Sequence, residues 1–440
     1  MSVDALLPIV DFESLDAAGR RAALARPAAE ERDQVLALVR DTVRTVRTGG
    51  DAAVLEFARR FDGGAPASLR VAAAELDAAL GSLPGAERSA LERAIANVRA
   101  FHAAQLPAPI VVETAAGVRC ERITRPLDSV GLYVPGGSAP LPSALIMSAV
   151  PAALAGVRRR VLCTPARGGR VHPAILATAR LCGVDEVFAV GGAQAIAALA
   201  YGTESIPKVD KIVGPGSAWV TAAKQVVAED PQGAALDLPA GPSEVLVIAD
   251  ASARAEFIAA DLLAQAEHDP LSQALLLTPS AVLAAAVRDA ALRQFAQLSR
   301  GDILRQSLAR SRLLVVRDLD AAIRLSNGYA PEHLLLQVGD PRSLLERVQS
   351  AGSVFLGPWS PEPMGDYCSG TNHVLPTYGY ARAYSGLSVL DFLKRITVQE
   401  LTADGLRGLG PTASILARLE GLDAHALAVD LRLRALEVDP

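Results

Sequence analysis

A glutamate and a histidine stand side by side in the stretch APEHLL, at residues 330–335. An imidazole titrates near neutral pH and a carboxylate can accept a proton, so Glu332 and His333 could both act as bases in one reaction. Neighbouring side chains of a regular strand, however, point to opposite faces. The simpler interpretation is therefore a capping glutamate beside a histidine at the edge of the core.

Three further stretches carry side chains that could bind a metal ion. LLAQAEHDP places Gln265 and His268 on one face at the end of a helix, although a surface histidine without a ligand is the commoner explanation. MGDYCSGTNHV offers Asp366 as a carboxylate ligand. In LEGLDAHALAV, His425 is expected in the first turn of a helix, where the dipole favours the neutral imidazole that a metal needs.

Cys368 and the two glycine-rich loops each allow a functional and a purely structural interpretation. Cys368 could be a nucleophile or a small buried side chain, and the absence of a CxxC pair predicts reduced thiols. YVPGGSAPLPS and GPGSAW could hold a phosphate on backbone N–H groups. Trp219 occupies the position of the third glycine of a GxGxxG motif, and no GK[ST] follows either loop. Each loop alone is more typical of a tight strand-to-helix turn.

These residues need a scaffold, and the sequence predicts an α/β one. From residue 129 short β-rich runs alternate with Ala-rich helices, and a second such series begins after residue 239. We expect two incomplete Rossmann-like, doubly wound domains that face a cleft, plus a helical C-terminal extension from LDFLKRITVQEL onward. Asn327 and Gly328 should close a helix, and Pro331 should push Ala330 into an extended conformation before the strand LLLQV begins. The Glu–His pair would then lie at a loop-to-strand junction.

Bulk properties exclude several classes of protein. The 440 residues carry a formal net charge of -5, and no cluster of Lys and Arg is interleaved with aromatic residues, so no nucleic acid partner is expected. The N-terminus does not resemble a secretory signal. Residues 131–157 are uncharged but interrupted by prolines, so no membrane span is expected. We therefore expect a cytoplasmic protein.

Taken together and in order, these stretches resemble the histidinol dehydrogenase family. The similarity runs from about residue 30 to the C-terminus, through VGLYVPGGSAPLPS, AVGGAQAIAALAYGT, KIVGPGSAWVTAAK, LDLPAGPSEVLVIAD, LLAQAEHDP, NGYAPEHLL, SPEPMGDYCSGTNHVLPT and LEGLDAHALAV. The resemblance implies an enzyme that uses zinc and NAD to oxidise L-histidinol to L-histidine, the last step of histidine biosynthesis. It also implies an intertwined homodimer.

The resemblance further implies roles for individual residues. One zinc ion per subunit would have the ligands Gln265, His268, Asp366 and His425, the last from the same chain or from a partner. The substrate site would be lined by Ser243, Gln265, His268, His333, Asp366, Glu420 and His425. The NAD site would contain Tyr133, Gln194 and Ser217. Ser217 replaces the asparagine that the family usually has, and a hydroxyl offers one donor where an amide offers two.

The resemblance also implies a division of the chain into four parts. The reaction that it implies gives Glu332 and His333 separate tasks. Residues 1–28 would be an N-terminal extension, 29–130 with 240–384 the metal and substrate domain, 131–239 the NAD-binding domain, and 385–440 a helical dimerisation tail. His333 would take the hydroxyl proton as hydride leaves, and Glu332 would activate the water that adds to the aldehyde. A thiohemiacetal on Cys368 is a less favoured route.

Three other functions stay open on the sequence alone. A paralogue could oxidise another polar alcohol on the same scaffold. A zinc hydrolase could use Glu332 to activate water without NAD. A metal-storage or scaffold protein would need neither base.

Overall fold

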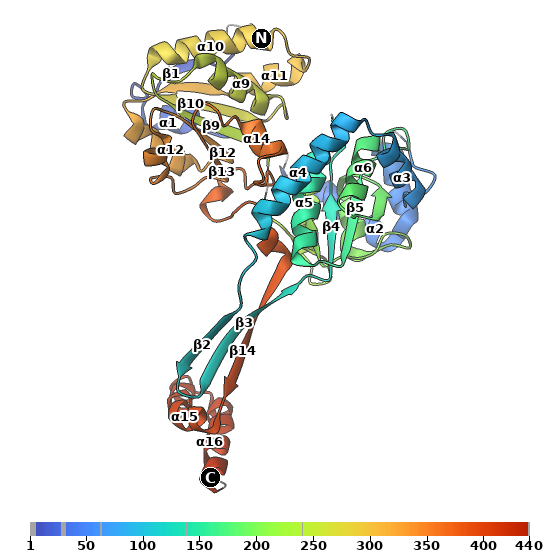
Figure 1. Cartoon of the computed structure of the whole chain (residues 1–440), viewed down its shortest axis with the longest axis vertical. Coiled ribbons are helices and arrows are strands. Elements are labelled where there is room, and N and C mark those ends of the chain that lie inside the picture. Colours follow the sequence, from blue (N-terminus) through green and yellow to red (C-terminus); the bar gives the residue numbers. More distant parts are fainter. Residues whose placement is uncertain (1–5, 28–31, 62–63, 137–138, 240, 439–440) are drawn as a thin grey trace. The chain divides into compact units, whose positions relative to one another are not determined.

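The computed structural model describes residues 6–27, 32–61, 64–136, 139–239 and 241–438, and it divides into two compact units. The first comprises Met1–Gln105 and Asp128–Asp391, and the second comprises Leu106–Leu127 and Phe392–Pro440. The first unit contains two parallel sheets with helices on their faces, and the second contains an antiparallel sheet and two helices (Figure 1). The expected α/β class is confirmed.

The larger sheet of the first unit has six parallel strands in the order β1-β11-β10-β9-β12-β13. In that order they are Ile9–Asp11, Arg312–Val315, Gln273–Thr278, Glu244–Ala249, His333–Gln337 and Ser353–Leu356. Every residue of β9, β10 and β12 is buried. Burial on both faces explains why these strands are almost continuous apolar runs in the sequence.

Helices cover both faces of this sheet (Figure 1). One core cluster contains residues of α9 (Ala255–Ala266), α10 (Ala281–Phe295) and α11 (Gly301–Arg310), and the other contains residues of α1 (Ala17–Ala23), α12 (Leu319–Tyr329) and α13 (Pro341–Leu345). Successive residues of β9 alternate between the two clusters, as the pleat requires. The chain continues after β13 through α14 (Glu362–Tyr367) and the 3-10 turns η2 (Tyr380–Arg382) and η3 (Val389–Phe392).

The smaller sheet has five parallel strands in the order β6-β5-β4-β7-β8. The strands are β4 (Ser129–Tyr133), β5 (Arg159–Thr164), β6 (Glu186–Ala189), β7 (Lys211–Val213) and β8 (Ala235–Leu236). The connecting helices are α5 (Pro142–Ala155), α6 (Pro173–Leu181), α7 (Gly192–Tyr201) and α8 (Ala218–Glu229). The chain first extends from β4 through β5 to β6, and then returns to the other side of β4 with β7. The direction in which successive strands are added to the sheet therefore reverses between β4 and β7.

The N-terminal helices pack on the smaller sheet's helices. The helix α2 (Arg32–Phe61), which is kinked at Gly50, contacts α7 and α8, whereas α3 (Ala73–Ser82) contacts α6 and α4 (Gly85–Ala103) contacts α5. This packing differs from the expected grouping of residues 29–130 with 240–384, because the valines on the inner face of α2 share one core cluster with α7 and α8. No helix in the described ranges has both the length and the hydrophobicity needed to cross a bilayer.

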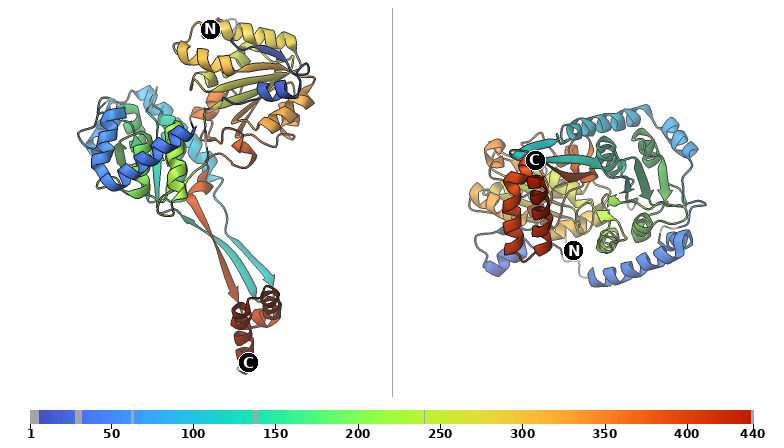
Figure 2. Two further views of the ribbon diagram at one scale, coloured as in Figure 1. Left: turned by 180° about the vertical axis from the view of Figure 1, so that it is seen from behind. Right: turned by 90° about the horizontal axis from the view of Figure 1, so that it is seen from below.

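The second unit corrects one element of the prediction. LDFLKRITVQEL is not helical: Leu393–Leu401 form β14, which pairs antiparallel with β3 (Val118–Pro126), and β2 (Ile110–Ala115) pairs with the other edge of β3. Thr397 and Val398 are β-branched, which suits a strand. The expected C-terminal helices follow as α15 (Ala403–Leu419) and α16 (Asp423–Val438), which pack side by side (Figure 2).

Candidate metal and catalytic site

The candidate metal and substrate residues of the first unit gather at the amino edge of the six-stranded sheet. Glu332 and His333 stand at the start of β12, and Ser243 immediately precedes β9, the strand that pairs with β12. Gln265 lies in the last turn of α9, which returns the chain to this edge. His268 follows the end of that helix, so it is not on the helix face that the spacing predicted.

The conformation before β12 differs from the prediction. Ala330 is not extended but left-handed, with φ 55° and ψ 68°, because it caps the end of α12 by donating its N–H to the Ser326 carbonyl at 2.7 Å. The bend brings the two adjacent side chains together: Glu332 Oε2 lies 3.6 Å from His333 Nδ1. The strand rule that separates neighbours therefore does not apply at this junction.

Backbone groups of β9 hold the Glu–His pair in place. The N–H of Glu244 donates to Glu332 Oε2 at 2.8 Å, and the Glu244 carbonyl lies 3.4 Å from His333 Nδ1. Both side chains are buried. The Glu244 side chain is itself fixed by Arg26, with nitrogen–oxygen distances of 2.6 and 2.9 Å, and by the Tyr329 hydroxyl at 2.8 Å.

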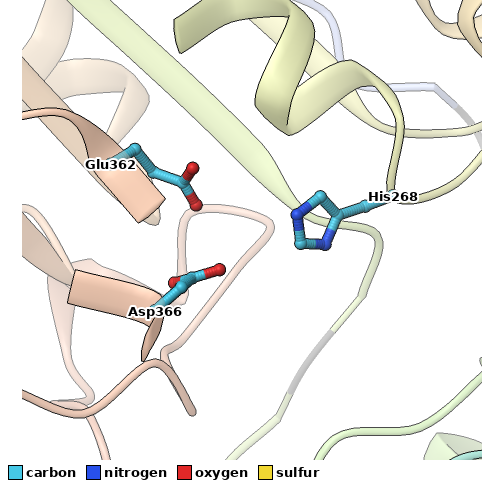
Figure 3. Close-up of side chains that lie close together, drawn as sticks. All are labelled: His268, Glu362 and Asp366. Carbon is cyan, nitrogen blue, oxygen red and sulfur yellow. The ribbon is translucent and has the colours of Figure 1, made fainter. Parts of the chain in front are cut away.

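Three side chains converge in an arrangement that could hold a cation (Figure 3). One ligand atom from each of His268, Glu362 and Asp366 lies within 4.8 Å of the others. His333 Nε2 faces the same two acids, at 3.6 Å from Asp366 Oδ1 and 3.8 Å from Glu362 Oε1. Sequence reasoning missed Glu362, although its spacing from Asp366 was a usable signal, since residues i and i+4 of α14 share one face.

Unpaired buried polar atoms indicate that this cluster is built for a ligand. Both amide atoms of Gln265 are buried without a hydrogen-bond partner among the described residues, and so are Glu362 Oε1, Asp366 Oδ1 and His333 Nε2. Leaving one such group unsatisfied costs roughly 1–3 kcal/mol. Their concentration in one place fits a cation with mixed nitrogen and oxygen ligands.

The charges within the cluster shift the acid–base equilibria strongly. Burial raises the pKa of Glu332 to about 8 and that of Glu362 to about 8. Burial opposes protonation of His333, but the nearby carboxylates, Glu332 foremost, raise its pKa to about 10. Burial also opposes ionisation of Asp366, yet the imidazole of His333, whose Nε2 lies 3.6 Å from Asp366 Oδ1, and those of His373 and His268 hold the pKa of Asp366 below its usual value. A bound cation would favour the neutral imidazole and the ionised acids.

The three candidate NAD residues lie together at the carboxyl edge of the five-stranded sheet. Tyr133 ends β4, and its hydroxyl accepts a hydrogen bond of 3.1 Å from the Gly192 N–H at the start of α7. Gln194 is buried in the first turn of α7, with its Nε2 unpaired, and Ser217 caps α8. These positions surround the point where the strand order reverses, which is where such sheets bind dinucleotides.

Two of the candidate residues, Glu420 and His425, belong to the second unit. Glu420 ends α15, and His425 lies in the first turn of α16, as expected; both are exposed. Their part in the site remains a prediction.

Cys368 is half-buried and follows α14. Its backbone carbonyl accepts a hydrogen bond of 2.8 Å from Asn97 Nδ2, and its thiol forms no disulfide.

Comparisons with known proteins agree with this architecture. The family model of histidinol dehydrogenase matches residues 25–433. The chain is 54% identical to histidinol dehydrogenase from Vibrio parahaemolyticus over 427 residues, which cover 97% of this chain and 98% of that protein. It is 56% identical to the enzyme from Xanthomonas axonopodis over 432 residues, covering 97% and 99%. The chain belongs to the histidinol dehydrogenase family.

A solved structure supports the same assignment. Histidinol dehydrogenase from Elizabethkingia anophelis superposes with a TM-score of 0.92 at 41% identity, covering 98% of this chain and 99% of that one. The expectations of an oxidoreductase that acts on histidinol, and of a role in the last step of histidine biosynthesis, are confirmed by membership of the family.

Proposed function

We propose that the chain carries out the four-electron oxidation of L-histidinol to L-histidine through histidinaldehyde, with two NAD⁺ as acceptors. The observation that supports this most strongly is the meeting of two kinds of group at one place: a buried pair of bases, Glu332 and His333, and a candidate cation-binding cluster whose two acids face His333. An alcohol whose imidazole and amine are held at the cluster would present its hydroxyl to the bases.

The residues present fit a zinc ion. Gln265, His268 and Asp366 would hold it, together with His425, and Glu362 is added to the candidates by its place in the cluster. Zinc supplies positive charge that anchors the imidazole and amine of the substrate and favours the ionised acids around it. Ser243 and Glu420 would complete the substrate site as the resemblance implies.

The two bases would divide the reaction between them. His333 takes the hydroxyl proton while hydride leaves the same carbon for NAD⁺, which yields the aldehyde. Glu332 then takes a proton from water, which adds to the aldehyde as a gem-diol. The gem-diol loses a proton to His333 and a hydride to the second NAD⁺, which yields the carboxylate. The hydrogen bond from the Glu244 N–H positions Glu332 for the water step.

NAD would bind at the reversal point of the five-stranded sheet, through Tyr133, Gln194 and Ser217. A Cβ on Gly214 would lie 2.1 Å from the Tyr133 carbonyl, so only glycine permits this close approach of the loop to β4. Ser217 makes no side-chain cap bond to α8, which leaves its hydroxyl available to the dinucleotide.

A homodimer would explain the surface of the second unit. All six residues of β2 are exposed. So are large apolar side chains on α15, on α16 and in the turn between them, namely Leu409, Ile415, Leu416, Leu419, Leu422, Leu427 and Leu431. Exposed apolar surface on this scale is typical of a protein–protein interface. We infer that a second copy of the chain covers it.

Histidinol-dependent reduction of NAD⁺ tests the proposed function directly. Purified protein should form two NADH for each histidine, lose this activity with a chelator, and regain it when zinc is added. A zinc hydrolase would form no NADH, and a paralogue would form NADH only with another alcohol; either result would refute the proposal.

A further inference from the structure

A buried ion pair lies beside the two bases, and the proposed reaction gives it no task. Arg26 follows α1, and its guanidinium donates two hydrogen bonds to the Glu244 carboxylate, from Nε at 2.6 Å and from Nη2 at 2.9 Å. The Glu244 side chain is only 2% exposed and that of Arg26 is 15% exposed. Burying two charges costs desolvation energy, which only close contacts of this kind offset. The backbone N–H and carbonyl of the same Glu244 contact Glu332 and His333.

The Arg26 guanidinium also contacts the segment that leads into the bases along the chain. Its Nη2 donates to the Tyr329 carbonyl at 2.8 Å and lies 3.4 Å from the Ala330 carbonyl. The guanidinium carbon lies over the Tyr329 ring, 3.8 Å from its centre. Tyr329 ends α12, and only Pro331 separates Ala330 from Glu332. One side chain therefore joins the start of β9 to the bend before β12.

The bend at Ala330 needs support of this kind. A left-handed backbone is unfavourable for alanine, because its Cβ crowds the following carbonyl oxygen, and Ala330 has φ 55°. Such a conformation persists only where the surrounding structure holds it. Arg26 binds the carbonyl groups on both sides of the Ala330 Cα. It therefore supports the conformation in which Glu332 meets the Glu244 N–H.

Arg26 is itself fixed through its neighbours on both sides along the chain. The Ala25 carbonyl accepts a hydrogen bond of 2.9 Å from Gln273 Nε2. The Pro27 carbonyl accepts one of 2.5 Å from the Tyr378 hydroxyl. Gln273 is buried at the start of β10, the strand that pairs with β9. The guanidinium therefore extends from a backbone that is anchored to the sheet, as the support of an active site requires.

We propose that Arg26 is a positioning residue of the active site. Through Glu244 and the bend at Ala330, it holds the Glu332 carboxylate where that group takes a proton from water. This role rests on the proposed function, in which Glu332 acts in the aldehyde step alone. His333 depends on Arg26 less, because its Nδ1 lies 3.4 Å from the Glu244 carbonyl, whereas the bond from the Glu244 N–H to Glu332 measures 2.8 Å.

Arg26→Lys tests this role without leaving the Glu244 carboxylate unpaired. A lysine keeps the positive charge, but its single ammonium lacks the fork that binds a carboxylate and two carbonyl groups together. In single-turnover measurements we expect the oxidation of histidinaldehyde to slow about 10- to 100-fold, and the oxidation of histidinol to aldehyde to slow much less. Arg21→Lys, on the exposed face of α1, is the matched control and should leave both rates unchanged. Equal slowing of both steps in Arg26→Lys, or none, would overturn the proposal.

A double-mutant cycle separates positioning from a general loss of structure. If Arg26 acts through the Glu332 carboxylate, adding Arg26→Lys to Glu332→Gln should slow the aldehyde step no further. A further slowing as large as that caused by Arg26→Lys alone would mean that the two residues act independently, and the positioning role would be wrong.

A readout without turnover keeps this proposal apart from the proposed function. In a crystal structure of Arg26→Lys, we expect the Glu332 carboxylate to have lost its hydrogen bond with the Glu244 N–H. An unchanged position of Glu332 would overturn the positioning role whether or not histidinol is oxidised. Absence of NADH formation by the unmodified chain would instead refute the proposed function.

Discussion

At the scale of single residues, the divided roles of Glu332 and His333 lead to different phenotypes. Glu332→Gln removes the base for water but keeps the amide oxygen that can accept from the Glu244 N–H. We expect the oxidation of histidinaldehyde to slow about 100-fold or more, and the oxidation of histidinol to aldehyde to slow much less. His333→Asn should slow both. Single-turnover measurements with each substrate would check this, and equal small effects on both steps would contradict it.

A buried acid next to the site gives a prediction about stability. Asp261 on α9 is 4% exposed, and burial raises its pKa to about 7, partly opposed by a hydrogen bond from the Glu362 N–H. In the unfolded chain the carboxyl group ionises near its usual pKa of 3.8. Keeping it protonated in the folded state therefore costs free energy once the pH rises above that value, and the full cost applies above about pH 7. The cost amounts to roughly 4 kcal/mol at most.

Asp261→Asn should therefore stabilise the folded state more at high pH than at low pH. The amide keeps an oxygen for the Glu362 N–H and carries no charge. We expect a clear rise in Tm at pH 8 and a much smaller one at pH 5, measured by thermal denaturation of the metal-free protein. A rise of equal size at both pH values would show that ionisation of Asp261 is not the cause.

Cys368 offers a simple test of the covalent alternative. Its surroundings give it a structural role through the carbonyl bonded to Asn97, and backbone bonds do not depend on the thiol. Cys368→Ala should therefore oxidise histidinol fully to histidine at close to the normal rate. Accumulation of aldehyde in this variant would revive the thiohemiacetal route.

At the scale of elements, a buried ion pair supports the NAD loop. Asp237 accepts hydrogen bonds of 2.8 Å from the N–H groups of Gly214 and Leu238 and pairs with Lys224, which also donates to the Gly214 carbonyl at 3.0 Å. Asp237→Asn keeps the shape but removes the charge opposite a buried lysine. We expect KM for NAD⁺ to rise about tenfold with a smaller change in kcat. The exposed Glu229→Gln on α8 is the control, and a fall in kcat alone would argue against a positioning role.

The elements also show how far the sequence could predict the fold. Strands such as β9 and β12 were recognisable because burial on both faces makes them apolar throughout. The exposed strands β2 and β14 lack that signal, since neither has a buried residue and β14 carries polar side chains along much of its length. The edge at which the site lies depends on where α9 and α14 return to the sheet. That is a tertiary property, and it explains why the bases are at the amino edge and not at the carboxyl edge that the fold class favours.

At the scale of the whole molecule, the second unit raises the question of shared sites. Glu420 and His425 belong to the unit whose apolar surface we assign to a dimer, while the bases belong to the first unit. If each site takes His425 from the partner, mixing inactive Glu332→Gln and His425→Asn subunits should create one site with both residues intact. We expect about a quarter of normal activity in a random mixture of subunits, because half of the dimers then carry one complete site. No recovery in mixed dimers would place His425 in the same subunit as the bases.

The amino-edge location of the bases has a practical consequence for the opposite edge of the six-stranded sheet. The turns after β9 and β12 meet there, where Asp250 accepts from the N–H groups of Ser252 and Gly339 at 2.9 Å. No candidate site residue lies in these turns, and residues 339 and 340 are exposed. A fluorophore, an affinity handle or an inserted peptide attached at this turn would stand on the far side of a six-stranded sheet from the reacting carbon. Such an attachment would let the enzyme be immobilised or followed while it works.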